Sequence, residues 1–377
     1  MRTATTRKSP RCLLQALTVV LAWVSVLHAA PKQAGGTCHA LLIGGMPGTG
    51  IHARHYRDWL TRFHRYLTGP AKVPAANVVV LSGEKGFSDP VVNGLATAES
   101  IEKALADMAG RVEEADQFIL FMVGLGVSTE PVPAFVVPGP DVNARQLADG
   151  LARIRARNQV VLNFSASSGE SAPILSAERR VVVSANMPNE NTPPVYAEFF
   201  LRGLESGRAD GRDAPAAGKK DGTITLLEAY HWAAFNTAQW IARQRKAGED
   251  LWRVDGAESV EVFRKLYVSA AGESGSRRLD PASDASSPDR VVRLKLEGAE
   301  DEIAKSRRRV VTEHASLEDC GAEEPVSALG DETKDYVPLA GKGEAEPGYL
   351  AGRVVLGRAE LMPAQSELSN AAGKPAR

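Results

Sequence analysis

Apolar runs alternate with amphipathic stretches through residues 38–246. Five runs are apolar almost throughout, which is the pattern of strands buried on both faces; they cover residues 39–45, 77–82, 117–123, 159–164 and 180–185. After the first run, Tyr56, Trp59 and Phe63 stand at helical spacing. Buried strands that alternate with helices predict one α/β domain over residues 38–246, a doubly wound, mainly parallel sheet with helices on both faces.

Polar residues mark where the predicted helices begin. Thr97 precedes a helical pattern and is a typical N-cap. Asn143 and Gln146 are spaced as a capping box at the start of a second helix. Two more helices are predicted over residues 195–204 and 226–245.

The part of the chain beyond residue 246 has a different composition. Its first portion is rich in Ser, Gly, Asp and Ala, which is typical of a linker. Residues 290–298 predict a strand and residues 299–315 a helix, so residues 247–322 are interpreted as a linker with a small C-terminal extension. No sustained periodicity runs through residues 323–377, and we expect a disordered tail there.

The N-terminal segment has the pattern of an export signal. Basic residues precede an uncharged run over residues 12–27, and small residues follow it. This order is typical of a secretory signal peptide. We therefore expect residues 1–30 to be a signal peptide and the protein to be secreted or periplasmic; an uncleaved anchor is the alternative. The run is short for a membrane span, which needs roughly 20 apolar residues, and no second segment is long and apolar enough to cross a bilayer.

The net charge bears on nucleic-acid binding, and the cysteines bear on whether a disulfide can form. The 377 residues carry a formal net charge of −1, which argues against a nucleic-acid binder because phosphate contact needs a basic face. Export would place Cys38 and Cys320 in an oxidising compartment, where disulfides persist. The sequence leaves open whether the two cysteines pair. Cys38 precedes the first strand, so it is expected at the N-terminal edge of the sheet.

Several short motifs, taken in order, resemble a peptidase family. They are "HALLIGG", "ATAESIEKAL", "FILFMVGLG", "VVPGPDV", "QVVLNFSASSG", "RVVVSA" and "DGTITLLEAY". The series resembles the legumain-like cysteine peptidases of the caspase-like superfold, and in particular their secreted bacterial members. It covers residues 38–245, with a further match at "VTEHASLED". The resemblance implies a caspase-like fold.

The resemblance also implies where catalytic residues would lie. In the family, a His sits between two glycines at the end of the third strand, and a Cys ends the fourth strand three residues before the Gly of a Ser-Gly pair. Here those positions are Leu125 and Ala166. A cysteine nucleophile needs an imidazole to take its proton, and leucine and alanine supply neither group. The resemblance therefore implies a degenerate dyad.

Neighbouring residues are candidate substitutes for the dyad. Ser165 and Ser167 flank Ala166, but a serine hydroxyl needs a base within hydrogen-bond reach. His52 and His55 follow the first strand, so they could face the same edge of the sheet. Their i, i+3 spacing would also allow metal binding on one helix face. The simplest interpretation of both histidines is a solvated first helical turn.

Residues 217–228, "AGKKDGTITLLE", have the length of a calcium loop. Asp221 and Glu228 stand at positions 5 and 12, but Ala217 and Lys219 occupy positions 1 and 3, where oxygen ligands belong. We interpret Asp221 and Glu228 as remnants of such a loop and expect no metal and no cofactor. A turn followed by a helix that Thr225 and Glu228 cap explains the same residues.

Three functions follow from these observations. The leading hypothesis is a secreted, non-catalytic pseudopeptidase whose strand ends hold a peptide or protein partner. The first alternative is an active cysteine- or serine-type peptidase with a rearranged site. The second is a structural envelope component that acts through its tail. Reactivity toward an active-site-directed probe would separate the active peptidase from the other two.

Overall fold

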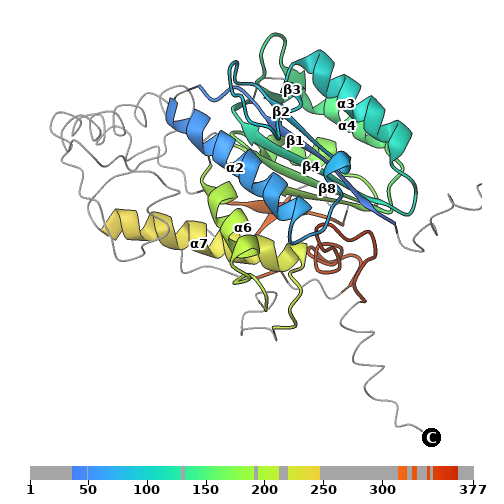
Figure 1. Ribbon diagram of the computed structural model, residues 1–377. Helices are drawn as coiled ribbons and strands as arrows, with labels where there is room; N and C mark the ends of the chain where they lie inside the picture. The colour runs from blue at the N-terminus through green and yellow to red at the C-terminus, as the bar shows by residue number, and fades with distance from the viewer. Residues whose placement is uncertain are drawn as a thin grey trace, which may run out of the picture. The chain divides into compact units, whose positions relative to one another are not determined.

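The computed structural model describes residues 36–48, 50–128, 132–190, 194–211, 220–246, 313–320, 325–328, 338–339 and 343–363. Within these ranges eight strands form one sheet in the order β11-β10-β9-β8-β4-β1-β2-β3 (Figure 1). Their bounds are β1 Cys38–Gly44, β2 Val78–Ser82, β3 Gly94–Leu95, β4 Gln117–Gly124, β8 Asn158–Ser165, β9 Arg180–Ser184, β10 Ser316–Glu318 and β11 Val326–Ser327. Neighbours from β3 to β9 pair in parallel. The predicted α/β class and the five predicted strands are confirmed.

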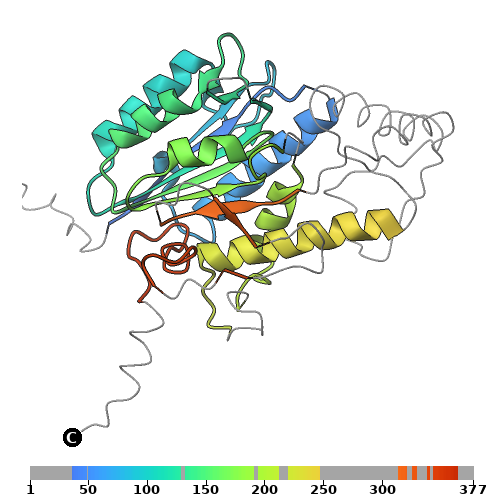
Figure 2. The same ribbon diagram turned by 180° about the vertical axis from the view of Figure 1, so that it is seen from behind.

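Helices cover both faces of this sheet, as Figures 1 and 2 show. The α-helices within the described ranges are α2 Gly50–Thr68, α3 Ala98–Arg111, α4 Ala144–Ala152, α5 Ala172–Leu175, α6 Tyr196–Glu205 and α7 Leu226–Lys246, and the short 3-10 turns are η1 Ala75–Asn77 and η2 Gly169–Ser171. One core contains side chains of α2, α6 and α7, and the other contains those of α3, α4 and α5. None of the described helices is long and apolar enough to cross a bilayer.

Strand geometry explains why the predicted strands are apolar throughout. Successive side chains of a strand point to opposite faces of the sheet. In β4, Ile119 and Phe121 belong to the core beneath α2, α6 and α7, whereas Leu120 and Met122 belong to the core beneath α3 and α4. Each full burial of such a side chain contributes about 1.5–3 kcal/mol. Both faces of the sheet therefore supply stability.

The predicted helix caps are present. Thr97 accepts a hydrogen bond from Ser100 N at 3.2 Å, and Ser100 Oγ accepts one from Thr97 N at 2.8 Å. Asn143 and Gln146 form the same reciprocal pair at 3.0 and 2.9 Å. α3 starts after β3, at the carboxyl edge of the eight-stranded sheet, and α4 starts after β7 (Val142–Asn143). β7 belongs to a small antiparallel sheet with β5 (Gly126–Val127) and β6 (Ala134–Phe135).

The predicted domain end at residue 246 is wrong, because the sheet continues in β10 and β11. β10 pairs antiparallel with β9, placing Ser316 opposite Ser184. Figure 2 shows β10 and β11 in orange at the edge of the sheet. The predicted strand over residues 290–298 lies outside the described residues. Of the predicted helix, residues 313–315 are described; they are not helical and lead into β10. Short strands that pair with distant strands carry too little periodicity to be recognised locally.

The expectation of a disordered tail is also wrong for residues 343–363. Within that segment Val354 is fully buried. Gln117 Nε2 donates to Val355 O at 3.1 Å, and Gly357 N donates to Gln117 Oε1 at 2.8 Å. Asn158 Nδ2 donates to Ala359 O at 3.0 Å. Side-chain amides at the starts of β4 and β8 thus hold this segment by hydrogen bonds to its backbone. Such bonds do not depend on the side chains of the segment, so its sequence shows no periodic pattern.

Asp319, directly after β10, is a second anchor of this segment. Its two carboxylate oxygens accept hydrogen bonds from Gly348 N and Ala351 N, each at 2.8 Å. Replacing Asp319 with Ala should leave both N–H groups unsatisfied, at a cost of about 1–3 kcal/mol. We expect limited trypsin digestion to cut faster after Arg353 and Arg358 in this variant than in an Asp107→Ala control. Equal cutting rates would show that Asp319 does not hold the segment.

Candidate functional site

The two positions that the resemblance assigns to a catalytic dyad lie at the carboxyl edge of neighbouring strands. β4 and β8 pair in parallel with Gly124 opposite Ser165. Leu125 and Ala166 follow these two residues directly, and Ala166 N donates to Gly124 O at 3.2 Å. The expectation that both positions meet at one edge of the sheet is confirmed. Neither side chain contains a group that could gain or lose a proton.

Backbone segments approach each other very closely at this edge. A Cβ on Gly126 would lie 2.0 Å from Ala166 O, and one on Gly169 would lie 2.2 Å from the carbonyl carbon of Met187. Real Cβ atoms do not approach backbone atoms to such distances, so both positions require glycine. The shape of the turn after β8 therefore depends on these two residues.

Ser165 is held inside a chain of neutral hydrogen bonds. It is 2% exposed, and its Oγ donates to Asn163 Oδ1 at 2.7 Å. Asn163 Nδ2 donates to Ser171 Oγ at 2.8 Å, and Ser171 Oγ donates to Ser168 O at 2.7 Å. An amide oxygen accepts a hydrogen bond but is not a base that removes the proton. The Ser165 hydroxyl thus has a structural partner and little access to a substrate.

Ser167 has an uncommon backbone conformation within the same turn. Its φ is 53°, in the left-handed region, and its side chain is buried. Non-glycine residues in this region cost free energy and are frequent at functional turns. Ser168 follows, and its Oγ accepts a hydrogen bond from Asn186 N at 3.2 Å. The turn after β8 is consequently tied to the loop after β9.

The solvated interpretation of His52 and His55 is wrong, because both are buried. His52 is 4% exposed and His55 is 5% exposed. The His52 ring stacks on Tyr56 at 6.0 Å between centroids, and the His55 ring stacks on Trp59 at 5.6 Å. Aromatic neighbours one turn later along α2 thus contribute to their burial. Within the described part of the chain, no group of three or more His, Cys, Asp or Glu side chains is arranged to hold a metal.

An apolar surface borders the Leu125 position. Leu125 N donates to Met46 O at 3.3 Å, and Met46 N donates to Val136 O at 2.9 Å. These bonds tie the loop between β1 and α2 to the end of β4. Leu125 is half-buried, and Met46 is 38% exposed; among the described residues, Phe235 is the other large apolar residue that is exposed. Gly48, at φ 69°, approaches Leu125 so closely that its Cβ would lie 2.9 Å from Cδ1.

A histidine–carboxylate pair that sequence reasoning missed lies beyond the end of β9. His314 N donates to Glu190 Oε2 at 3.1 Å, and His314 Nδ1 contacts Glu190 Oε1. Glu190 also accepts a hydrogen bond from Met187 N at 2.9 Å. The pair joins the loop after β9 to the segment before β10. The sequence signal was the "VTEHASLED" match, whose histidine has no role in the predicted dyad.

Comparison with known proteins supplies no family assignment. No family model matches the chain, and no curated protein matches it. Among solved structures, the crystal structure of caspase-1 from Spodoptera frugiperda matches with a TM-score of 0.33 and 11% sequence identity, over 54% of this chain and 77% of that chain. The fold class rests on the strand order and pairing described above.

The calcium-loop remnants serve a turn and a helix cap. Glu228 Oε2 accepts a hydrogen bond from Thr225 N at 2.7 Å, and Glu228 N donates to Thr225 Oγ1 at 3.2 Å. Asp221 Oδ1 accepts one from Thr223 N at 2.7 Å, and Gly222 adopts a φ of 83°. The capped-turn interpretation is confirmed. Ala217 and Lys219 lie outside the described residues.

Cys38 lies at the opposite edge of the sheet, as expected. It begins β1 and is 1% exposed, and its Sγ donates to Gln117 Oε1 at 3.4 Å. Burial raises the pKa of this thiol to about 12. Cys38 is a free thiol, so the disulfide with Cys320 that the sequence left open is not formed.

Proposed function

We propose that the protein is a secreted, non-catalytic pseudopeptidase of the legumain-like kind that binds a peptide or protein segment at the carboxyl edge of its sheet. The observation that carries the proposal is the pair of adjacent strand ends with Leu125 and Ala166 at the positions where the family has its base and nucleophile. Secretion rests on the export pattern of residues 1–30.

Hydrogen bonding argues against a serine nucleophile in place of the missing cysteine. A nucleophilic serine needs an accessible hydroxyl and a base that takes its proton. Ser165 has a buried hydroxyl that donates to the Asn163 amide. This bond stabilises the turn and leaves the hydroxyl unactivated.

The surface beside the dyad positions supports a binding role. Met46 and Leu125 place apolar surface at the strand ends, where ligands bind in open α/β sheets. Methionine adapts its shape to varied partners. The tail-based alternative is weakened, because residues 343–363 are packed against the sheet.

A peptide library tests this proposal. We expect the purified protein to retain a subset of peptides without cutting them. Met46→Asp should weaken binding of those peptides at least about tenfold, as loss of an apolar anchor does at interfaces. Ala345→Asp, which introduces the same charge at another exposed position, should leave binding unchanged. Peptide retention that is equal in both variants would place binding elsewhere and contradict the proposal.

A further inference from the structure

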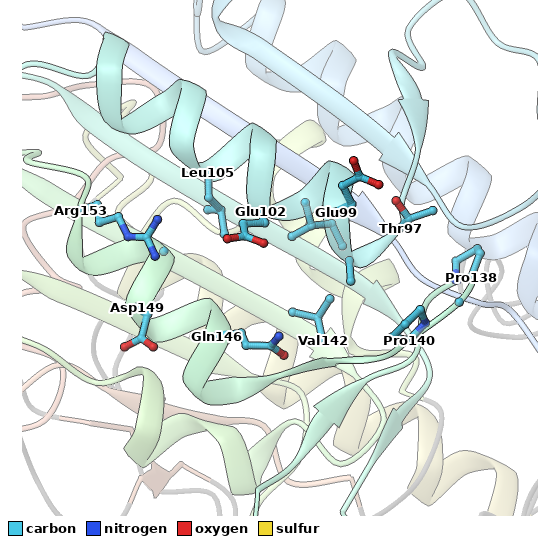
Figure 3. Close-up of a pocket in the computed structure, with 14 residues that line it drawn as sticks. Thr97, Glu99, Glu102, Leu105, Pro138, Pro140, Val142, Gln146, Asp149 and Arg153 are labelled. Carbon is cyan, nitrogen blue, oxygen red and sulfur yellow. The ribbon is translucent and has the colours of Figure 1, made fainter.

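A hollow lies between α3 and α4, and neither Leu125 nor Ala166 lines it. It encloses about 680 Å³ and is closed at one end by the loop from Pro138 to Pro140 (Figure 3). Pockets that hold small ligands or short peptide segments have volumes of roughly 300–1,000 Å³. We call this hollow the α3/α4 groove.

The floor of the groove is apolar. Ile101 and Leu105 of α3 line it, together with Val142 of β7, and all three are buried. Gly150 has no Cβ, which allows α4 to lie close to α3 at this point. A Cβ at position 150 would lie only 2.7 Å from Leu105 Cδ1. Ala98 also lines the groove and leaves it open, since its side chain is small. An apolar side chain of a ligand would therefore lose contact with water on this floor.

The rim of the groove is acidic on both sides. Figure 3 shows Glu99 and Glu102 on α3 and Asp149 on α4, on opposite sides of the groove. All three side chains are exposed. Arg153 is the one cation among the lining residues. Three carboxylates and one guanidinium give the groove lining a formal charge of −3 + 1 = −2.

Asp149 is disfavoured by the end of its own helix. α4 ends at Ala152, so Asp149 stands in the last turn, where the partial negative charge of the helix end disfavours a carboxylate. Aspartate is also a poor residue inside a helix. Arg153, four residues later, offsets part of this effect. A further cation from outside the chain would offset more of it.

We propose that the α3/α4 groove binds a basic peptide segment in which apolar side chains alternate with Lys or Arg. The apolar side chains would rest on Ile101, Leu105 and Val142. The cations would lie along the acidic rim that Glu99 and Glu102 of α3 and Asp149 of α4 form. An acidic segment would be repelled by the same rim. This binding site is separate from the strand-end surface around Met46 and does not rest on the proposed function.

Fluorescence polarisation with a labelled Leu-Arg-Leu-Lys-Leu-Arg peptide and the full chain tests the inference. We expect saturable binding that weakens as NaCl rises, because salt screens exposed charges. A Leu-Glu-Leu-Glu-Leu-Glu peptide should not bind. Glu102→Lys combined with Asp149→Lys should weaken binding of the basic peptide at least about tenfold.

Matched variants distinguish binding in the groove from nonspecific electrostatic attraction between the peptide and the protein. Glu114→Lys combined with Glu360→Lys makes the same change in net charge at exposed positions outside the groove and should leave the affinity within about twofold, since long-range effects of exposed charges are screened. Ala98→Trp fills the groove without a charge change and should weaken binding at least about tenfold. No binding of the basic peptide, equal weakening by both charge-reversal pairs, or unchanged affinity in Ala98→Trp would overturn the inference.

Discussion

Peptide substrates should remain intact when they are incubated with the purified, unmodified protein. Cysteine peptidases depend on a thiolate and an imidazole that act together. Loss of a catalytic nucleophile or base from a peptidase lowers the rate by about 10⁶-fold, and here both positions are apolar, with Leu125 and Ala166 on adjacent strand ends. Mass spectrometry of a peptide mixture after long incubation measures this directly.

Single substitutions at the dyad positions should not create activity. Ala166→Cys alone would place a thiol with a pKa near 8.5 beside no imidazole. Leu125→His alone would supply a base with nothing to activate. The double variant should also stay far below a native peptidase, because Ala166 is buried to 3% exposure and a reacting atom misplaced by about 1 Å can cost roughly 100-fold in rate.

A relocated active site would give a different pattern. Cleavage by the unmodified protein that survives Ala166→Gly but disappears in Ser165→Ala or His55→Ala would refute the pseudopeptidase proposal. Ser165→Ala also removes the hydrogen bond to Asn163, so its melting temperature must be compared with that of the unmodified protein. Labelling by a serine- or cysteine-directed probe would support the same conclusion independently.

The Gly126→Ala variant should lose a large part of its stability. The added Cβ would meet Ala166 O at 2.0 Å and Ser165 Oγ at 3.3 Å. The nearest atom belongs to the backbone of the neighbouring segment and cannot rotate away, so β4 and β8 must separate at their ends. Overpacking of this kind costs about 3 kcal/mol or more. At this domain size the melting temperature should fall by roughly 6–12 °C.

Gly110→Ala is the matched control for this substitution. Gly110 lies near the end of α3, and a Cβ there would meet nothing within 4 Å. Alanine inside a helix is favoured over glycine by about 0.5–1 kcal/mol, so this variant should melt at the same temperature or slightly higher. Thermal unfolding followed by circular dichroism measures both variants. An unchanged melting temperature for Gly126→Ala would show that the two strand ends do not approach as closely as described.

Local sequence was sufficient for the five long parallel strands, the longer helices and the caps of α3 and α4. Apolar runs such as residues 117–123 predicted strands because a strand buried on both faces has no polar position. Thr97 and Asn143 predicted helix starts because their side chains bond to backbone N–H groups only three residues away. The adjacency of Leu125 and Ala166 followed from parallel pairing and the order of the strands. These features depend on interactions that are short in sequence or repeated along a strand.

Only the tertiary structure decided which distant segments come together. β10 extends the sheet through pairing with β9, and residues 343–363 are held by the Gln117, Asn158 and Asp319 side chains. The burial of His52 and His55 and the groove between α3 and α4 likewise depend on how helices pack. A few hydrogen bonds to backbone atoms, or a cavity between two helices, do not require a regular spacing of apolar residues in the sequence. Their positions therefore emerge only when the chain is folded.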